Sequence, residues 1–357
     1  MEKQKSSRVQ LINVVKSFGD NTVLHGISLD IEAGSLTTLL GPSGCGKTTI
    51  LRLIAGLELP TSGQVIIGDE DVSVLSASQR DVAMVFQSYA LFPHMTVGQN
   101  VGYGLKMQGI AKEERRQRVK EALDSVGLDG FQDRYIDQMS GGQQQRVAVA
   151  RALILEPKVM LFDEPLSNLD SKLRRQMRED IRRLQQELGV TSVYVTHDQD
   201  EALAVSDDVV VMRDGVIEQK GSPKELYLQP NSKFVATFMG DANIIMGEVI
   251  ATGDKSELRI DDVEIVTDKP MEEKLLNKTI EIAIRPEALS LMSAEDKAAG
   301  LPCTIASKAY IGSAIEYSVK WHDQELFLVS ATGSQEFNIG DSAKVLITPP
   351  GIAPIPE

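Results

Sequence analysis

Short apolar runs that end in polar residues alternate with amphipathic stretches along the first two thirds of the chain. Four runs are rich in aliphatic and β-branched residues and predict buried strands at residues 35–40, 159–162, 191–196 and 209–212. Strands that alternate with helices are typical of an α/β fold with a mainly parallel sheet. Three of the runs lead into polar residues at their carboxyl ends, where such sheets place their ligands.

Two longer stretches predict amphipathic helices at residues 112–126 and 171–188. In both, apolar residues recur every three or four positions, so each helix presents one apolar stripe to the core. The stripes are Val119, Ala122, Leu123 and Val126 in the first helix and Leu173, Met177, Ile181, Leu184 and Leu188 in the second.

The pattern changes near residue 240. Residues 222–225 have the spacing of a helix start, and Gly240 closes the helical stretch that follows. Short β-rich runs then follow between glycine, aspartate and asparagine turns, at residues 279–284, 315–319, 325–329 and 343–347. This pattern predicts a small all-β domain, so we expect two domains, residues 1–239 and residues 240–357.

Charge and composition support this division and narrow the function. Of the net charge of −14 over 357 residues, −10 falls in residues 240–357, which hold 20 acidic and 10 basic side chains. Such a surface argues against a nucleic-acid partner. No apolar run approaches the roughly 18 residues of a membrane span, and the polar start of the chain lacks a signal core. With Cys45 and Cys303 as the two cysteines, there is no disulfide framework, and we expect a cytosolic protein.

Residues 41–48 match the phosphate-binding pattern G-x-x-x-x-G-K-[ST], between a predicted strand and a predicted helix at residues 49–55. The glycines let backbone N–H groups approach phosphate oxygens, Lys47 balances the charge of the β- and γ-phosphates, and the Thr48 hydroxyl can bind Mg²⁺. The predicted nucleotide-binding residues are Gly41, Pro42, Ser43, Gly44, Cys45, Gly46, Lys47, Thr48 and Thr49.

Other strand ends carry residues suited to ATP hydrolysis. Asp163 can hold the water shell of Mg²⁺, and Glu164 can position or deprotonate the attacking water. His197 and Gln87 follow two further apolar strands. Either is more often structural when it stands alone, but beside Lys47 and the two carboxylates His197 becomes a candidate contact of the γ-phosphate, and Gln87 a further candidate site residue.

A second glycine turn, made of Ser140, Gly141, Gly142 and Gln143, opens directly into a predicted helix. Free N–H groups and the positive end of the helix dipole make such a turn an anion-binding device. It lies 93 residues after Lys47, and a single nucleotide in a single chain rarely needs two phosphate-binding turns. The presence of both turns suggests that two chains close on shared nucleotides.

The order of these motifs, with Ser-Asn-Leu-Asp at residues 167–170 before His197, resembles the ATP-binding cassette (ABC) family. The resemblance implies a P-loop NTPase fold with a helical subdomain at about residues 88–157. It also implies a head-to-tail homodimer, in which each ATP lies between residues 41–48 of one chain and residues 140–143 of the other.

The same resemblance assigns roles to single residues. Glu164 would be the general base, His197 the γ-phosphate sensor, and Gln87 a ligand that links Mg²⁺ to the partner-facing segment. Phe18 matches the aromatic residue that stacks on adenine, with a core phenylalanine as the alternative, and Asp170 would lie at the dimer seam. Two departures, Met139 for the usual leucine and Thr48 for the commoner serine, keep the chemistry of their positions.

The tail also resembles part of a known group. Ile-Arg-Pro-Glu at residues 284–287 is similar to a motif of the OB-like, TOBE-type regulatory domain of importer ATPases for sugars, polyamines and ferric iron. Residues 87–95 look like that subfamily, and residues 99–105 and 140–146 most resemble its ferric-iron members. The resemblance implies import of ferric iron, with polyamine, sugar, hexose phosphate or phosphonate as alternative solutes.

Taken together, these features predict the ATP-hydrolysing subunit of a bacterial ABC importer on the cytoplasmic side of the inner membrane. Its expected partners are two integral-membrane permease subunits, bound through an apolar groove near residues 88–105, and indirectly a periplasmic solute-binding protein. The alternatives are an ABC ATPase of DNA repair or translation and an ATP-switched regulatory module. A separate hypothesis is that modification of Cys45 blocks nucleotide binding.

Overall fold

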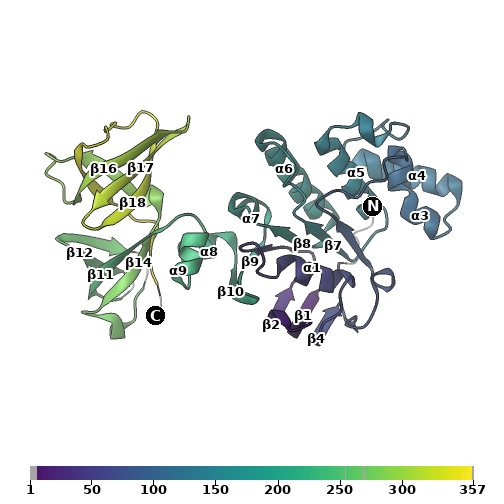
Figure 1. Ribbon diagram of the computed structural model, residues 1–357, viewed down its shortest axis with the longest axis horizontal. Coiled ribbons are helices and arrows are strands. Elements are labelled where there is room, and N and C mark those ends of the chain that lie inside the picture. Colours follow the sequence, from purple (N-terminus) through teal and green to yellow (C-terminus); the bar gives the residue numbers. More distant parts are fainter. Residues whose placement is uncertain (1–5, 254, 268–269, 356–357) are drawn as a thin grey trace. The chain divides into compact units, whose positions relative to one another are not determined.

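The computed structural model describes residues 6–253, 255–267 and 270–355 (Figure 1). The chain divides into two units, Met1–Pro223 and Lys224–Glu357. This division lies earlier than the boundary expected at residue 240. The difference concerns the helical stretch α8 (Pro223–Leu228) and α9 (Lys233–Phe238), nearly all of which goes with the second unit.

A six-stranded, mainly parallel sheet forms the centre of the first unit, with strand order β10-β9-β3-β8-β7-β6. The four strands predicted from apolar runs are β3, β7, β8 and β9. The bounds are β3 Leu36–Leu40, β6 Val82–Val85, β7 Val159–Asp163, β8 Thr191–Thr196, β9 Asp208–Arg213 and β10 Val216–Gly221. Because β3, β6, β7 and β8 are parallel, the residues that follow them meet at one edge of the sheet.

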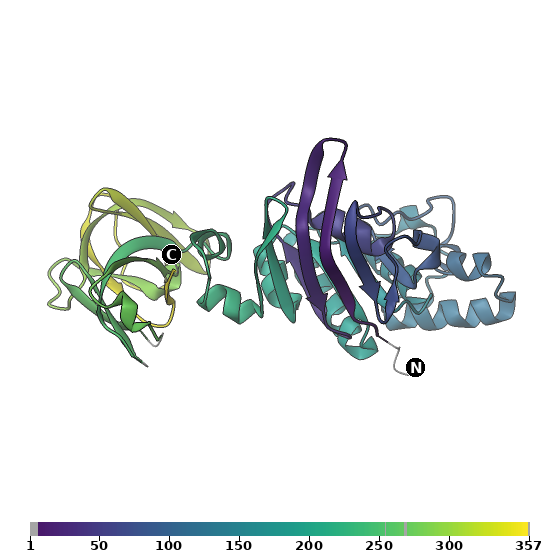
Figure 2. The ribbon, with the colours of Figure 1, turned by 90° about the horizontal axis from the view of Figure 1, so that it is seen from below.

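A second, antiparallel sheet of the first unit has the order β2-β1-β4-β5, and its two long strands are the purple pair of Figure 2. Its strands are β1 Val9–Phe18, β2 Asn21–Ile31, β4 Ser62–Ile67 and β5 Glu70–Asp71. Their alternating burial shows that one face packs on the core, where Val9, Leu24 and Val65 are fully buried. The sequence analysis did not predict this sheet.

Helices cover the central sheet and form a group beside it (Figure 1). The helix predicted at residues 171–188 is α6 (Ser171–Leu188), and the one predicted at 112–126 is α4 (Lys112–Ser125). The other helices of this unit are α1 Lys47–Ala55, α2 Val97–Val101, α3 Tyr103–Met107, α5 Gly141–Leu153 and α7 Gln199–Val205. The predicted stripes are buried at their centres, at Val119 and Leu123 in α4 and at Met177, Ile181 and Leu184 in α6.

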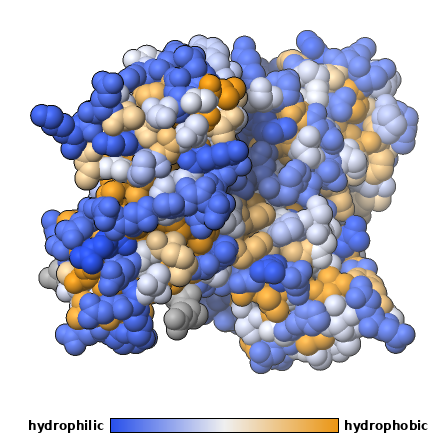
Figure 3. All heavy atoms as spheres, turned by 60° about the vertical axis from the view of Figure 1, so that its left-hand side comes forward, coloured by the Kyte–Doolittle hydropathy of each residue, from blue (hydrophilic) through white to orange (hydrophobic). Residues whose placement is uncertain are grey.

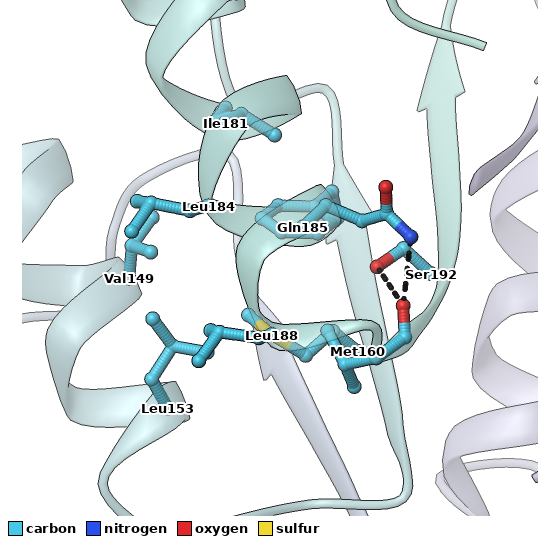
Figure 4. A pocket seen from close by; sticks show the side chains of 10 residues that line it. Val149, Leu153, Met160, Ile181, Leu184, Gln185, Leu188 and Ser192 are labelled. Carbon is cyan, nitrogen blue, oxygen red and sulfur yellow. Dashed lines mark hydrogen bonds between the residues drawn. The ribbon is translucent and has the colours of Figure 1, made fainter. Parts of the chain in front are cut away.

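Figure 4 shows how α6 packs on α5 and the sheet. Leu184 and Leu188 face Val149 and Leu153 of α5, and Gln185 donates a hydrogen bond of 3.0 Å to the carbonyl of Val190. The cavity among these side chains has a volume of about 10 Å³ and is almost entirely apolar. A space of that size holds at most one water, so it is a packing gap of the core and no ligand site.

The second unit is built from two five-stranded antiparallel sheets, ordered β13-β12-β11-β14-β20 and β15-β19-β16-β17-β18. Their apolar faces form one core, which includes the chain's only tryptophan, Trp321. The bounds are β11 Asn243–Ala251, β12 Ser256–Ile260, β13 Val263–Thr267, β14 Thr279–Ile284, β15 Leu289–Ser293, β16 Leu301–Tyr310, β17 Ala314–Trp321, β18 Gln324–Ala331, β19 Ser342–Ile347 and β20 Ile352–Pro354. The predicted all-β domain is confirmed.

Arg285 explains why α8 and α9 belong to the second unit. Its side chain is 2% exposed and donates hydrogen bonds to the carbonyl oxygens of Tyr227, at 2.9 Å, and Ala236, at 2.7 Å. The guanidinium also lies 4.0 Å from the centre of the Tyr227 ring. One buried side chain thus holds the end of each helix against the β domain.

Hydrophilic residues dominate the face seen in Figure 3, and hydrophobic residues lie among them in small groups. In the described part of the chain, every helix is too short or too polar to span a membrane.

Candidate functional site

The glycine-rich loop at residues 41–48 connects β3 to α1 and wraps around its own lysine. The Lys47 ammonium is buried and donates to the carbonyl oxygens of Gly41, at 2.7 Å, and Pro42, at 2.9 Å. Cys45 is also buried, with its sulfur 3.8 Å from the same ammonium. A cation held by two neutral carbonyls can exchange them for phosphate oxygens, which carry charge and accept stronger hydrogen bonds.

Two positions of this loop require glycine. A Cβ atom at Gly41 would lie 2.3 Å from the carbonyl oxygen of Met212, so no larger residue fits there. Gly46 precedes α1 with φ +104°, a left-handed conformation that other residues rarely adopt. The loop therefore keeps its backbone open at the start of α1, where N–H groups without helical partners can bind phosphate.

Oxygen atoms suited to Mg²⁺ lie next to this loop. The Thr48 hydroxyl, in the first turn of α1, lies 3.3 Å from a carboxylate oxygen of Asp163 at the end of β7. Burial raises the pKa of Asp163, while the hydrogen bond from Thr48 opposes this rise. A half-buried carboxylate beside a hydroxyl is a hard-oxygen donor set, and a divalent cation would relieve the cost of burying its charge.

Glu164, the next residue, stands at the meeting point of three strand ends. Its φ of 43° is rare for a non-glycine residue, and its N–H donates to the carbonyl of Val195 on β8 at 3.0 Å. Its carboxylate lies 3.4 Å from Nδ1 of His197 and 3.4 Å from Nε2 of Gln87. The three predicted residues that follow β6, β7 and β8 are thus brought together.

Residues 167–168 tie this group to the loop before α6, a connection that sequence reasoning missed. The Gln87 amide lies 3.2 Å from the Ser167 hydroxyl, and the Asn168 side chain donates to the Gln87 carbonyl at 3.0 Å. Ser167 and Asn168 belong to a motif that the sequence analysis named. No sequence pattern indicated that they contact Gln87, which lies 80 residues earlier in the chain.

The second glycine turn caps α5. The Ser140 hydroxyl accepts from the Gln143 N–H at 3.4 Å, and the Gln143 side chain accepts from the Ser140 N–H at 3.0 Å. This capping box leaves the N–H groups of Gly141 and Gly142 without a helical acceptor. A Cβ atom at Gly141 would lie 3.3 Å from Leu169.

Asp170 follows Leu169 and caps α6 by accepting from the Leu173 N–H at 3.0 Å. The second glycine turn therefore lies beside the loop that carries Asp170. Among the described residues, no hydrogen bond or ion pair joins residues 140–143 to residues 41–48.

Phe18, at the end of β1, is 47% exposed. The alternative that it is a core phenylalanine is therefore wrong. The Lys16 ammonium lies 4.5 Å from the centre of its ring and also pairs with Glu58 at 2.9 Å. Sequence analysis missed Lys16, because a lone lysine in a strand carries no pattern.

A groove of about 760 Å³ lies among α2, α3 and α4, at the place where an apolar groove was expected. Its wall combines apolar and basic side chains, so the expected apolar groove is a mixed apolar and basic one. The lining residues are His94, Met95, Thr96, Gly98, Gln99, Gly102, Tyr103, Lys106, Lys112, Arg115, Arg116, Val119, Gln132 and Asp133. The stretch at residues 88–105 contributes Met95 and Tyr103 to this wall, and α4 contributes Val119.

Two family models match the chain. Residues 24–167 match the model described as ABC transporter, and residues 282–352 match the TOBE domain. A cassette named MJ0796, solved as a dimer bound to ADP and Pi in a post-hydrolysis state, is 34% identical, with a TM-score of 0.54. The alignment covers 60% of this chain and 98% of that one.

Curated relatives are similar over nearly the full length. The Fe(3+) ions import ATP-binding protein FbpC of Photobacterium profundum is 54% identical, with 98% of this chain and 97% of that protein covered. The FbpC proteins of Vibrio cholerae and Escherichia coli K12 are each 53% identical, with 99% and 96% of this chain covered and the same shares of theirs. The chain therefore belongs to the ABC transporter family and is one of its ATP-hydrolysing subunits, with a C-terminal TOBE domain.

Proposed function

We propose that this chain is the ATPase subunit of a bacterial importer of ferric iron. The observation that carries the ATPase role is the meeting of Gln87, Glu164 and His197 beside the Thr48–Asp163 pair, at the carboxyl edge of one sheet. The solute is inferred from the names of relatives that are 53–54% identical over nearly the whole chain.

In the proposed cycle, two copies pair head to tail around two ATP molecules. Each nucleotide lies between residues 41–48 of one copy and residues 140–143 of the other, with adenine against the exposed ring of Phe18. Two features support this arrangement. The N–H groups of Gly141 and Gly142 point to no acceptor of their own helix, and the solved relative MJ0796 is a dimer with bound ADP and Pi.

Glu164 acts as the general base in this proposal. Its carboxylate takes a proton from water as the water oxygen attacks the γ-phosphorus in line, and ADP leaves with the electrons of the broken P–O bond. His197 and Lys47 hold the γ-phosphate oxygens. Thr48, Asp163 and Gln87 hold Mg²⁺, which when bound neutralises phosphate charge.

The groove among α2, α3 and α4 is the proposed binding site for the membrane partner. Four basic side chains, Lys106, Lys112, Arg115 and Arg116, line it, so the docking segment of each permease subunit should carry acidic residues. The chain would then work as a peripheral subunit on the cytoplasmic face of the inner membrane, and reach the periplasmic solute-binding protein only through the permease.

Uptake of radioactive ferric iron tests the proposal in the bacterium that encodes the chain. Deletion of the gene should abolish uptake, wild-type protein should restore it, and Glu164→Gln should not. Loss of polyamine, sugar, hexose-phosphate or phosphonate uptake with normal iron uptake would assign another solute. If no uptake changes while the purified chain hydrolyses ATP, the importer role is wrong.

A further inference from the structure

Arg174 lies in the first turn of α6, four residues after Asp170, and its guanidinium reaches three acceptors. Nη2 donates to the carbonyl of Leu169 at 3.1 Å, and Nη1 donates to Asp198 at 3.4 Å. Nε lies 3.8 Å from the carboxylate of Glu201. The first acceptor belongs to the loop before α6, and the other two follow His197 in the chain.

Glu201 binds the end of β8, the strand that leads into His197. Its carboxylate is 3% exposed and accepts from the hydroxyls of Tyr194, at 3.0 Å, and Thr196, at 2.8 Å, both on β8. The Thr196 oxygen also accepts from the N–H of Asp198 at 3.0 Å. The residues immediately before and after His197 are therefore both bound into the Arg174–Glu201 network.

This network is charged, and its Glu201 carboxylate is buried while Arg174 and Asp198 are partly exposed. A buried carboxylate needs a cation, and Arg174 is the cation that faces Glu201. The N–H at Nε is buried and has no hydrogen-bond partner among the described residues. A movement of about 1 Å would turn its 3.8 Å contact with Glu201 into a hydrogen bond, so the pair is arranged to tighten as the two loops approach.

We propose that Arg174, together with Glu201, is a positioning residue for ATP hydrolysis. It fixes the distance between the His197 loop and the loop at residues 167–170. The inference rests on the roles proposed above for His197 and Asp170. Because His197 faces the nucleotide of its own chain and Asp170 faces the dimer seam, Arg174 links the two nucleotide sites of the dimer.

Steady-state ATPase kinetics of Arg174→Met test this role. Misplacement of a contact by about 1 Å can cost a factor of about 100, so we expect kcat to fall by about 10–100-fold. KM and the Kd for ATP should stay within about 2-fold, because the phosphate loop is intact. Arg174→Lys should recover only part of kcat, since one ammonium cannot replace the planar fork.

Arg175 provides the matched control. It is the next residue of the same helix, is 77% exposed and pairs only with Glu179, at 3.5 Å, among the described residues. Arg175→Met should keep kcat within about 2-fold, as expected when an exposed ion pair is removed. An equal fall of kcat in both variants would overturn the proposal.

A spectroscopic readout separates positioning from general destabilisation. The chain has four histidines, so the side-chain NMR signal of His197 can be assigned with His197→Ala. Arg174→Met should shift or broaden that signal and leave those of His94 and His322 unchanged. An unchanged His197 signal would contradict the proposal even if kcat fell.

Two further variants keep the outcome decisive. Glu201→Gln retains the acceptor for Tyr194 and Thr196 but removes the charge that faces Arg174, so it should reproduce the fall in kcat if Arg174→Met does not fold. His197→Ala tests the proposed role of His197 itself. If it retains turnover, that role fails. If it loses turnover while Arg174→Met and Glu201→Gln do not, only the present inference fails.

Discussion

At the residue scale, Glu164 combines a backbone conformation that is rare for a non-glycine residue with the proposed chemistry. With φ of 43° and its N–H bound to Val195, the residue is held by the neighbouring strand, and its carboxylate faces His197 and Gln87. We expect Glu164→Gln to lower the hydrolysis rate at least ~100-fold with little change in ATP affinity, because the amide keeps the shape but cannot take a proton.

Phosphate release and nucleotide titration measure these two effects separately. Glu179→Gln is the control, because Glu179 is 69% exposed on α6 and pairs only with Arg175 among the described residues. It should behave as wild type. Turnover of Glu164→Gln within about 10-fold of wild type would remove Glu164 from the role of general base.

Asp163 gives a pH-dependent prediction about stability. Burial raises its pKa in the folded chain, so the folded state binds this proton more tightly than the unfolded state does. Stability is therefore lost as pH rises through the raised pKa, because the folded chain then holds a charge that burial disfavours. Without Mg²⁺, Asp163→Asn should have a Tm higher than wild type by about 2 °C or more at pH 7.

Thermal unfolding at several pH values checks this. The difference between the two proteins should shrink as pH falls toward the raised pKa of Asp163. Adding Mg²⁺ and ATP should raise the Tm of wild type more than that of the variant. A lower Tm for Asp163→Asn at pH 7 would mean that burial does not penalise this carboxylate.

Single residues were predictable where a fixed spacing or a strand end marks them. Lys47 and Glu164 could be placed in this way, because parallel strands bring their carboxyl ends to one edge. Arg174 and Lys16 could not, because their partners lie in other segments and no spacing along the chain encodes the contact. Cys45 was predicted as part of the loop and as a residue whose modification blocks nucleotide binding, and its place beside the Lys47 ammonium is new.

At the element scale, the Arg285 contacts make the attachment of α8 and α9 testable. Arg285→Met leaves two buried carbonyl oxygens without a donor, which should destabilise the second unit by about 1–3 kcal/mol. Trp321 is the only tryptophan and lies in β17, so its fluorescence during urea unfolding reports on that unit alone.

Arg259 on β12 is the control for this measurement. It is 44% exposed and pairs with Glu248 and Glu264 at the surface. Arg259→Met should change the unfolding free energy by no more than about 0.5 kcal/mol. Equal unfolding midpoints for Arg285→Met and wild type would show that the helices are not held by this side chain.

Elements with a strong period were predicted well, and those without one were not. The helix at residues 171–188 has the predicted bounds because its apolar stripe, its Asp170 cap and Gly189 all agree. The sheet of β1, β2, β4 and β5 was missed, since bulges in the pairing of β1 with β2 break the alternation on which strand prediction depends. The single helical stretch expected at residues 222–240 is two short helices.

At the scale of the whole molecule, the proposed dimer can be tested by mixing two inactive variants. Gly141→Asp places a carboxylate where the partner's γ-phosphate should lie, so it should bind ATP but lose dimerisation and lose turnover at least ~100-fold. Lys47→Ala damages the other half of the site. In an equimolar mixture, about half of the dimers contain one copy of each variant, and each mixed dimer has one intact site out of two. Activity of about a quarter of wild type should therefore return.

The control is Gly141→Ala. Its Cβ atom would lie 3.3 Å from Leu169 and needs only a small adjustment, so its turnover should remain within about 10-fold of wild type. If the mixture stays inactive although one tagged variant co-purifies the other untagged variant, each site is completed within one chain and the head-to-tail arrangement is wrong.

The hydrogen bonds from Arg285 to α8 and α9 also predict where genes of this family can recombine without loss of stability. A crossover near residue 240 would combine the β domain of one relative with the helices α8 and α9 of another. The hydrogen bonds from Arg285 to the carbonyls of those helices would then join parts of two different proteins. A crossover near Pro223 would transfer α8, α9 and both β sheets together, with every one of these bonds intact. Exchange of tails among relatives should therefore leave its breakpoints before α8, so that Lys224–Glu357 is inherited as one piece.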